Sequence, residues 1–389
     1  MALITSYNPM PITFSYGKGV WLYDEQGNEY LDGLSGIAVC GLGHAHPDVT
    51  KTIQEQAAKL LHTSNTFYIR QQELLAEKLT TMAGMEQVFF ANSGAEANEA
   101  AIKLTRLFGH KKGIETPSII VMERAFHGRT MATLTASGSR KVQAGFEPLV
   151  PGFIRAPFND LDAIHMIAAN REDVVAVMLE PIQGEGGIYA AEEGYLRAVA
   201  KLCEQHDWML ILDEIQTGNG RTGKLYSCMH YNIQPDILTT AKGLGNGVPI
   251  GACLMSKKAK DLFKPGSHGS TFGGNPLACA TALTVLEVME RDGICQQVSK
   301  NSAILMDKLV QSLGEHPHVK AIRGKGFMIG VELDRPATDM RNVGLRNGLI
   351  FNVTAETVVR LLPPLIISEE EIDELVKRLT LTINQFTEN

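Results

Sequence analysis

The chain has 389 residues, of which 44% are hydrophobic and 20% are charged, and its formal net charge is −7. This length is enough for a large buried core and usually for two domains. The acidic balance argues against nucleic acid as the main partner, because binding phosphates requires a basic surface, and no apolar stretch approaches the roughly 20 residues of a membrane span.

The first expected elements along the chain are a hairpin and a helix. Apolar residues alternate on both sides of the polar segment 24–28, which predicts a β-hairpin over residues 17–32. Residues 47–61 show helical spacing, so we expect a helix with one buried face. That face consists of Val49, Ile53, Ala57, Leu60 and Leu61. His44 and His46, just before this helix, fit a tight turn better than a metal site, and we expect no metal.

The centre of the chain alternates short apolar runs with amphipathic stretches. The runs at residues 119–122, 174–179, 209–212 and 237–238 are partly β-branched, as buried parallel strands are. A helical pattern at residues 192–206 separates the second run from the third, which predicts a β-α-β unit. We therefore expect an α/β domain with a mostly parallel central sheet that is flanked by helices.

The C-terminal region is expected to fold as an α+β unit of its own. Ser368 and Glu371 have the spacing of a capping box that begins a helix. Apolar residues at helical spacing follow the box, and we expect them to face inward. These residues are Ile372, Leu375, Val376, Leu379 and Ile383.

The six cysteines are isolated from one another, at positions 40, 203, 228, 253, 279 and 295. None forms a Cys-x-x-Cys metal or redox motif, so we interpret them as small buried apolar residues. The first residues have neither the basic segment nor the apolar run of a signal peptide. Together these features favour a reducing compartment, and we expect a cytoplasmic protein.

Asp213 and Lys242 carry the most information about function. Asp213 follows the run 209–212, so it stands at the carboxyl end of a strand, where open α/β sheets bind ligands. Lys242 follows the next run and enters a turn with glycines at 243, 245 and 247. Alone, the acid could cap a helix or bind Mg²⁺, and lone lysines usually lie on the surface. Together they are the pair that holds pyridoxal phosphate, with the lysine on its aldehyde and the acid under its ring nitrogen.

A phosphate site is suggested by Ser93, Gly94 and Ala95. These small residues follow an apolar segment and precede the helical stretch 100–107. A helix start without bulk leaves free N–H groups, which suit a phosphate. An ordinary helix cap would give the same pattern, so this signal is weak by itself.

The chain resembles the class III pyridoxal-phosphate-dependent aminotransferases of fold type I over nearly its whole length, because six segments typical of that family occur in it in the family's order. The segments are Ser-Gly-Ala-Glu-Ala-Asn-Glu at 93–99, Phe-His-Gly-Arg-Thr at 126–130, Glu-Pro-Ile-Gln-Gly-Glu-Gly-Gly at 180–187, Asp-Glu-Ile-Gln-Thr-Gly at 213–218, Lys242 with its glycines, and Ser-Thr-Phe-Gly-Gly-Asn-Pro at 270–276. The resemblance implies a large cofactor-binding domain over residues 56–260. It also implies a small α+β domain from residues 1–55 and 261–389.

The resemblance assigns further cofactor contacts. Phe126 would stack on the pyridoxal ring, and Gln216 would bond the ring hydroxyl oxygen. Gly94 and Ala95, beside Ser93, would donate backbone N–H groups to the phosphate. Glu180, which ends the run 174–179, is a further candidate for this pocket.

A shared active site is also implied. Thr271 would reach the phosphate bound in the neighbouring subunit, with Ser270 near the substrate. An obligatory homodimer follows from that arrangement. The alternative for both residues is a turn before Gly273 and Gly274.

Two arginines are implied to select the substrates. Arg129 would bind the α-carboxylate of N-acetylornithine, and Arg360 that of glutamate and 2-oxoglutarate, because a guanidinium holds a carboxylate by two hydrogen bonds. N-acetylornithine has only one carboxylate, which would leave Arg360 buried and unpaired. Arginine cannot lose its proton, so Glu185 would move to cover it.

The implied reaction transfers the δ-amino group of N-acetylornithine to 2-oxoglutarate, a step of arginine biosynthesis. Succinylornithine, succinyldiaminopimelate, ornithine and 4-aminobutyrate stay open as amino donors. A pyridoxal-dependent mutase or decarboxylase would not need both Arg360 and Glu185. A nucleotide-binding dehydrogenase would need a Gly-x-Gly-x-x-Gly turn, which residues 243–247 do not form.

Overall fold

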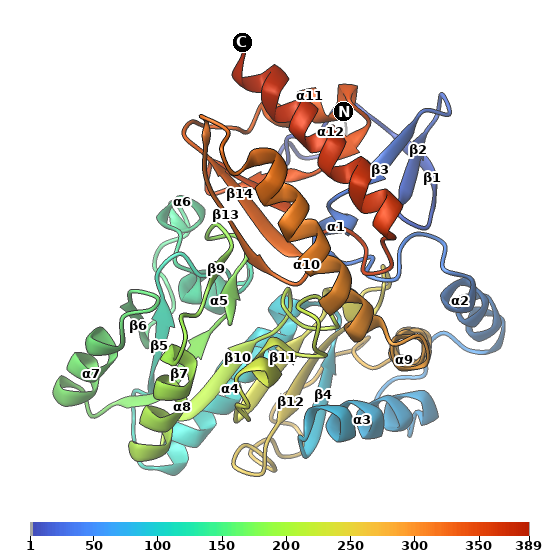
Figure 1. Cartoon of the computed structure of the whole chain (residues 1–389). Helices are drawn as coiled ribbons and strands as arrows, with labels where there is room; N and C mark the ends of the chain where they lie inside the picture. The colour runs from blue at the N-terminus through green and yellow to red at the C-terminus, as the bar shows by residue number, and fades with distance from the viewer. Residues whose placement is uncertain (1–2, 389) are drawn as a thin grey trace.

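A seven-stranded sheet forms the centre of the larger part of the molecule (Figure 1). The computed structural model describes residues 3–388. In sheet order the strands are β4 (Gln87–Ala91), β12 (Gly251–Met255), β11 (Ile237–Thr240), β10 (Met209–Asp213), β7 (Val174–Leu179), β5 (Ser118–Met122) and β6 (Phe153–Ala156). β12 is antiparallel to β4 and β11, and the other neighbouring pairs in this sheet are parallel. The expected mostly parallel sheet is confirmed.

The four predicted strands are β5, β7, β10 and β11, which all lie in this sheet. The predicted helix between the second and third is α8 (Tyr195–Gln205). Because β7 and β10 are parallel neighbours, the segment from β7 through α8 to β10 is the expected β-α-β unit.

Helices cover both faces of the central sheet. In β10, Leu210 and Leu212 belong to the apolar cluster that includes α8, whereas Met209 and Ile211 belong to the cluster that includes α4 (Gly94–Lys111). All four side chains are buried. Two-sided burial explains why the strand sequences are continuous apolar runs rather than alternating ones.

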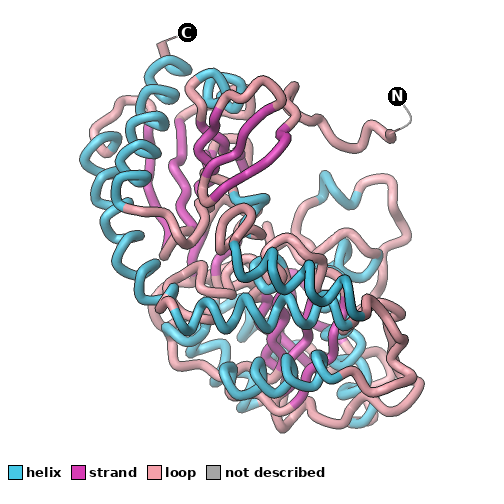
Figure 2. Tube along the Cα trace, turned by 90° about the vertical axis from the view of Figure 1, so that its right-hand side faces the viewer, coloured by secondary structure: helices cyan, strands magenta, loops and turns pink. Residues whose placement is uncertain are grey.

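The smaller part joins the two ends of the chain. One sheet has the order β1 (Phe14–Lys18), β2 (Trp21–Asp24), β3 (Glu29–Asp32) and β15 (Leu349–Ile350), with β15 parallel to β3. A second, antiparallel sheet has the order β13 (Val319–Lys325), β14 (Met328–Leu333), β17 (Val358–Leu361) and β16 (Asn352–Thr354). Figure 2 shows these strands beside the two long helices α10 (Ile294–Leu313) and α12 (Glu369–Thr387). The expected small α+β part from both ends of the chain is confirmed.

The predicted hairpin is β2–β3, and its turn is stabilised by Asp24. The Oδ1 atom of Asp24 accepts hydrogen bonds from the backbone N–H groups of Gln26 (2.9 Å) and Asn28 (2.8 Å). A side-chain oxygen that bonds to following N–H groups is the common way in which Asp stabilises a turn. The hairpin gains a third strand because β1 pairs with β2.

The prediction for residues 47–61 is partly wrong. The helix α2 spans Pro47–Lys59, and Leu60 is already extended. Val49 is buried and Ile53 packs on the core, but Ala57 is exposed, and Leu60 and Leu61 are 47% and 52% exposed. Periodicity marks an apolar face correctly but does not say whether the covering surface belongs to the same chain. The predicted domain limit at residue 55 falls inside α2, and the limits stay a prediction.

The remaining elements connect these layers. They are α1 (Ser35–Ala38), α3 (Arg70–Ala83), α5 (Met131–Ala136), α6 (Arg140–Gln143), α7 (Leu161–Asn170), β8 (Ile182–Gln183), β9 (Tyr189–Ala190), α9 (Pro276–Arg291) and α11 (Met340–Arg346), with 3-10 turns at Ser227–His230 and Lys242–Leu244. Over residues 3–388, no helix is long and apolar enough to cross a membrane. The same residues contain no cluster of three or more His, Cys, Asp or Glu side chains suited to a metal ion.

The six cysteines are free thiols. Four of them are buried, as expected for small apolar residues, and Cys40 and Cys295 are half-buried.

The predicted capping box begins α12. Ser368 Oγ accepts a hydrogen bond from the backbone N–H of Glu371 (3.2 Å), and Glu371 Oε2 accepts one from the backbone N–H of Ser368 (2.9 Å). The five residues predicted to face inward are all buried. This helix therefore packs as its sequence indicates.

Two leucines of α12 provide a test of this packing. Leu379 is fully buried, whereas Leu381 is 46% exposed on the same helix. We expect Leu379→Ala to lower the free energy of unfolding by about 2–5 kcal/mol, because it removes buried methyl groups and leaves a cavity. Leu381→Ala should change it by only about 0.5 kcal/mol. Urea unfolding of both variants measures the difference, and equal losses would contradict the packing described here.

Candidate active site

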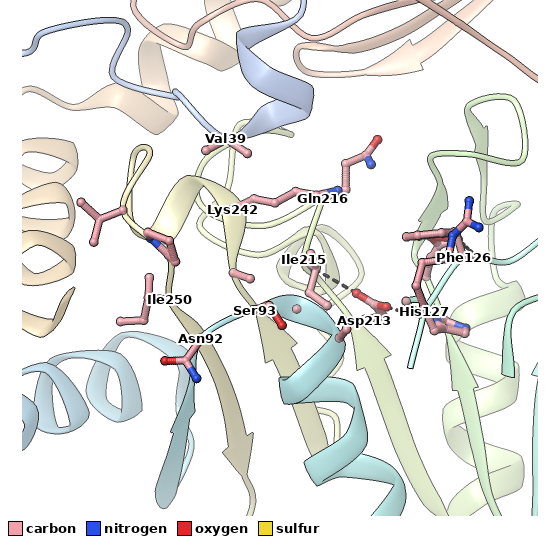
Figure 3. A pocket seen from close by; sticks show the side chains of 18 of the residues that line it. Val39, Asn92, Ser93, Phe126, His127, Asp213, Ile215, Gln216, Lys242 and Ile250 are labelled. Atoms are coloured by element: carbon pink, nitrogen blue, oxygen red, sulfur yellow. Dashed lines mark hydrogen bonds and ion pairs between the residues drawn. The ribbon is translucent and has the colours of Figure 1, made fainter. Parts of the chain in front are cut away.

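A cavity of about 430 Å³ lies at the carboxyl ends of β10 and β11, beside the N-terminus of α4 (Figure 3). Eight residues singled out from the sequence line it together: Ser93, Gly94, Ala95, Phe126, Arg129, Asp213, Gln216 and Lys242. Glu180 lines it as well, at the end of β7. The apolar residues Val39, Ile215 and Ile250 complete the wall.

Lys242 enters the cavity from the turn after β11. Its φ is +46°, a left-handed conformation that residues other than glycine rarely adopt. Figure 3 shows its side chain extending below Val39 toward Gln216. Burial lowers the pKa of the Lys242 amine from 10.5 to about 8, although nearby Glu185 opposes this shift. A substantial fraction of the amine is therefore neutral near pH 7.5, as a nucleophile or base requires.

Asp213 is held by three hydrogen-bond donors. Its Oδ2 atom accepts from Nδ1 of His127 and from Nδ2 of Asn98, both at 2.8 Å. Its Oδ1 atom accepts from the backbone N–H of Ile215 at 3.1 Å. The side chain is only 4% exposed. These donors fix the orientation of a buried carboxylate at the base of the cavity.

His127 and Asn98 are functional candidates that sequence reasoning did not assign a role. Asn98 Nδ2 also donates to the backbone oxygen of His127 (2.8 Å), and its Oδ1 accepts from Oγ1 of Thr239 (2.7 Å). Both residues lie inside motifs noted in the sequence. Asn98 also stands four positions after Gly94, which places it on the same helix face. That spacing was a usable signal, but the contact with Asp213 depends on the tertiary structure.

The N-terminus of α4 is packed closely against the cavity. Ser93 caps the helix, since its Oγ accepts from the backbone N–H of Glu96 (3.2 Å). A Cβ atom at Gly94 would lie 2.7 Å from Cδ1 of Ile215, so only glycine fits without a shift. The first N–H groups of a helix have no partner within it, and they make this end of the cavity suitable for a phosphate.

Phe126, Arg129 and Glu180 form one side of the cavity. The backbone N–H of Phe126 donates to Oε2 of Glu180 (3.4 Å), and the guanidinium carbon of Arg129 lies 5.8 Å from the Phe126 ring centroid. Arg129 is exposed at the opening, where a ligand can reach it. Burial and the nearby Asp213 carboxylate raise the pKa of Glu180 well above its ordinary value.

Arg360 and Glu185 form a pair next to this cavity. Arg360 Nη1 donates to Oε1 of Glu185 (2.6 Å) and to Oε1 of Gln216 (3.1 Å), and its Nε donates to Oδ1 of Asn352 (3.0 Å). The Arg360 side chain is fully buried, whereas that of Glu185 is 37% exposed. Arg360 Nη2 has no hydrogen-bond partner within residues 3–388. Burial alone would raise the pKa of Glu185, but the Arg360 charge outweighs it and lowers the pKa.

Ser270 and Thr271 do not line the main cavity of their own chain. They border a neighbouring hollow of about 310 Å³, which shares Asn92 with it. Ser270 Oγ accepts from Nδ2 of Asn92 (3.2 Å) and from the backbone N–H of Gly273 (3.0 Å), so it also stabilises a turn. Thr271 is exposed.

The main cavity fits pyridoxal phosphate. Lys242 offers an amine for the aldehyde, and Asp213 offers a carboxylate for the ring nitrogen. Phe126 offers an aromatic face, and the α4 N-terminus at Gly94 offers N–H groups for the phosphate. These four groups surround one space, and each matches a different part of the cofactor.

The chain belongs to the class-III aminotransferase family, whose model matches residues 3–383. It is therefore a pyridoxal-phosphate-dependent aminotransferase. An acetylornithine aminotransferase of Nitrosomonas europaea is 51% identical over 387 residues, which cover 100% of this chain and 98% of that protein. The acetylornithine aminotransferase of Methanocaldococcus jannaschii is 46% identical over 374 residues, which cover 96% and 94%.

Solved structures agree with this family. The N-acetylornithine aminotransferase of Stenotrophomonas maltophilia has a TM-score of 0.85 and 38% identity, with 97% of each chain covered. The ornithine aminotransferase of Toxoplasma gondii has a TM-score of 0.96 and 35% identity, covering 100% of this chain and 93% of that one. The fold is thus shared by relatives that are named for different amino donors.

The lowered pKa of Lys242 predicts how the apoenzyme takes up its cofactor. Only the neutral amine attacks an aldehyde, so the rate of covalent attachment should rise with pH and reach half its maximum near the Lys242 pKa of about 8. Stopped-flow absorbance after mixing apoenzyme with pyridoxal phosphate measures this rate.

Glu185→Gln is the matched control for this experiment. The Glu185 charge raises the pKa of Lys242, so its removal should move the midpoint to lower pH. A wild-type midpoint near 10 would show that burial does not lower this pKa.

Proposed function

We propose that this enzyme transfers the δ-amino group of N-acetylornithine to 2-oxoglutarate, giving N-acetylglutamate 5-semialdehyde and glutamate. One observation carries the proposal: Arg360 is fully buried beside the cavity, with Nη2 unpaired within residues 3–388 and a partly exposed Glu185 on Nη1. This activity belongs to arginine biosynthesis. The six free cysteines support a reducing, cytoplasmic location.

Arg360 suits the acceptor half of the reaction. A buried guanidinium cannot be neutralised, so leaving it unpaired is costly. The α-carboxylate of 2-oxoglutarate or glutamate would replace Glu185 and take up Nη2, forming a bidentate pair. The exposed fraction of Glu185 leaves it room to move aside. When a donor with a single carboxylate binds, Glu185 covers the charge.

Arg129 suits the donor half. It is exposed at the cavity opening, next to the Phe126 ring, where it can hold the α-carboxylate of N-acetylornithine. Val39 and Ile250 line the same cavity, and an apolar lining favours an uncharged acetamide over the charged α-amino group of free ornithine. In the acceptor half, Arg129 would bind the second carboxylate of 2-oxoglutarate.

The chemistry divides between the cofactor and the chain. Bound pyridoxal phosphate supplies an aldehyde that takes up the amino group and a ring that accepts electrons from the reacting carbon. Lys242 Nζ removes the proton from the carbon that carries the substrate amino group and later returns a proton. Asp213, which His127 and Asn98 hold in place, would stabilise a positive charge at the ring nitrogen. Phe126 would pack against the ring and exclude water from it.

Ornithine as the amino donor is the second candidate, because the Toxoplasma gondii structure named for it has a TM-score of 0.96. Several relatives named for acetylornithine reach 44–51% sequence identity, whereas the Toxoplasma gondii protein is 35% identical. Among the described residues that line the cavity, there is no tyrosine to receive a charged α-amino group. N-acetylornithine therefore remains the preferred donor.

A homodimer with a shared site is part of the proposal. Several large apolar side chains lie exposed on the segments around Ser270 and Thr271: Leu60, Leu61, Phe67, Tyr68 and Phe272. Asn65 connects two of these segments, since its Nδ2 donates to the backbone oxygens of Ser270 and Gly273 (both 3.0 Å). Such a concentration of apolar surface favours association with a second copy. Thr271 would then reach the phosphate bound by that copy.

A half-reaction scan tests the amino donor. Enzyme loaded with pyridoxal phosphate is mixed with each of five donors without keto acid, and the loss of the cofactor's visible absorbance is followed. The donors are N-acetylornithine, succinylornithine, succinyldiaminopimelate, ornithine and 4-aminobutyrate. We expect N-acetylornithine to react at least about tenfold faster than ornithine.

Lys242→Ala is the control and should abolish the change with every donor. Faster reaction with another donor would reassign the substrate while leaving the aminotransferase mechanism in place.

Phe272→Asp tests the dimer. A charge on this exposed ring should oppose association, lower the apparent mass in analytical ultracentrifugation, and weaken cofactor binding because Thr271 no longer reaches the phosphate. Met166→Asp is the matched control, since Met166 is a similarly exposed apolar residue on α7, away from Thr271. A wild-type enzyme that is fully active as a monomer would contradict a shared site.

A further inference from the structure

Arg221 is a fully buried arginine outside the cavity wall, with 2% of its surface exposed. Its hydrogen-bond partners are neutral oxygens: Nη1 donates to the backbone oxygens of Phe327 (3.2 Å) and Pro363 (2.5 Å), and Nη2 donates to Oγ of Ser35 (3.3 Å). The buried Asp32 carboxylate is near enough for its charge to favour the cation, although burial acts against it. Burying a cation whose hydrogen-bond acceptors are carbonyl and hydroxyl groups costs stability. The burial of Arg221 therefore indicates a role other than filling space in the core.

The three partners come from different parts of the chain. Ser35 lies in α1 of the N-terminal segment, Phe327 lies directly before β14, and Pro363 follows β17. Ser35 Oγ also donates to the backbone oxygen of Leu362 (2.7 Å), the residue before Pro363. One guanidinium thus joins the larger part of the molecule to both chain segments that build the smaller part.

Nη1 bonds to residues that flank two neighbouring strands, Phe327 before β14 and Pro363 after β17, and β17 carries Arg360. Arg360 lies on β17, three positions before Pro363, and is paired with Gly330 of the neighbouring strand β14. The backbone N–H of Phe327 also donates to the backbone oxygen of Arg221 (2.9 Å). Arg221 therefore contacts the Arg360 strand and the next strand of the same sheet.

On its other side, Arg221 is continuous with the cavity wall. It belongs to the loop that begins at Asp213 and includes Gln216. Its backbone N–H donates to the oxygen of Gly218 (3.2 Å), and the N–H of Gly218 donates to the oxygen of Glu214 (2.9 Å). A short, hydrogen-bonded segment connects the Arg221 guanidinium to the residues that face the cofactor site.

We propose that Arg221 is a positioning residue for the amino acceptor: its planar fork sets the place of Arg360 relative to Lys242 and Asp213. The inference rests on the proposed role of Arg360 in binding the α-carboxylate of 2-oxoglutarate. Without the fork, the two parts of the chain meet through a surface that tolerates small relative movements. A shift of about 1 Å at a substrate-binding group is enough to weaken a reaction by orders of magnitude.

Displacement of Arg360 should weaken the binding of N-acetylornithine, the amino donor, less than that of 2-oxoglutarate, the acceptor. N-acetylornithine is held by Arg129, which lies in the larger part of the molecule with Lys242 and Asp213. Only the acceptor requires a carboxylate site on β17. Loss of the fork therefore raises the KM for 2-oxoglutarate selectively, which a uniform loss of folding would not do.

The test uses the holoenzyme of Arg221→Lys, which keeps the charge but lacks a fork that reaches two oxygens at once. Steady-state kinetics are measured with each substrate varied, and thermal unfolding is recorded. The expected result is a KM for 2-oxoglutarate that rises roughly tenfold or more, while the KM for N-acetylornithine changes by less than about twofold. Ser35→Ala removes the Nη2 acceptor together with the hydrogen bond from Ser35 Oγ to Leu362. It should give a smaller change in the same direction, and it serves if Arg221→Lys does not fold.

Arg378→Met is the matched control. Arg378 is also a largely buried arginine that donates to a backbone oxygen, that of Gly348 (2.6 Å), but it lies on α12 away from the cavity. Its replacement should lower thermal stability and leave both KM values unchanged. An Arg221→Lys enzyme with a lowered melting temperature and two unchanged KM values, or with equal increases in both, would overturn the proposal.

Arg360→Met, measured in parallel, separates this inference from the proposed function. A large rise in its KM for 2-oxoglutarate, with no selective rise in Arg221→Lys or Ser35→Ala, would refute only the positioning role. An unchanged KM for 2-oxoglutarate in Arg360→Met would refute the assignment of Arg360 itself.

Discussion

The contact on which the rest of the site depends is the one between Asp213 and its three donors. Asp213 ends β10 at the centre of the sheet, where a buried carboxylate would be unstable without partners. Asn98 reaches it from α4, His127 from the loop after β5, and Ile215 from the same turn. The position of this one side chain therefore requires three separate elements to meet, and the cavity forms where they do.

Neighbouring charges help to set the pKa values of Glu180 and Glu185, the two glutamates near Lys242. Burial raises the pKa of a carboxyl group, but at Glu185 the charge of Arg360 outweighs burial and lowers the pKa. Glu180 lacks such a partner and lies near Asp213, so its pKa rises instead. The pKa values of two carboxyl groups beside one cavity are thus shifted in opposite directions, because an arginine charge lowers one while burial and a nearby carboxylate raise the other.

The site is also a junction between the two parts of the molecule. Lys242 and Asp213 belong to the seven-stranded sheet and its turns, whereas Arg360 belongs to a sheet built mostly from the C-terminal region. The N-terminal strands complete the same part through the pairing of β3 with β15. Arg360, the proposed acceptor-binding arginine, therefore lies in a different part of the molecule from Lys242 and Asp213, and the hydrogen bonds of Arg221 connect the two parts.

Much of this could be predicted from the sequence by itself. Four strands of the central sheet, the β-α-β unit, the capping box of α12, and the placement of Asp213 and Lys242 at strand ends all follow from local patterns, because residues close in the chain determine them. Only the tertiary structure determines three features: the contacts of His127 and Asn98 with Asp213, the buried guanidinium of Arg221, and the Nη2 of Arg360, which has no partner among the described residues. Each depends on residues far apart in the chain. The exposure of Leu60 and Leu61 was likewise visible only in the tertiary structure. Periodicity identifies an apolar face but does not show which surface covers it.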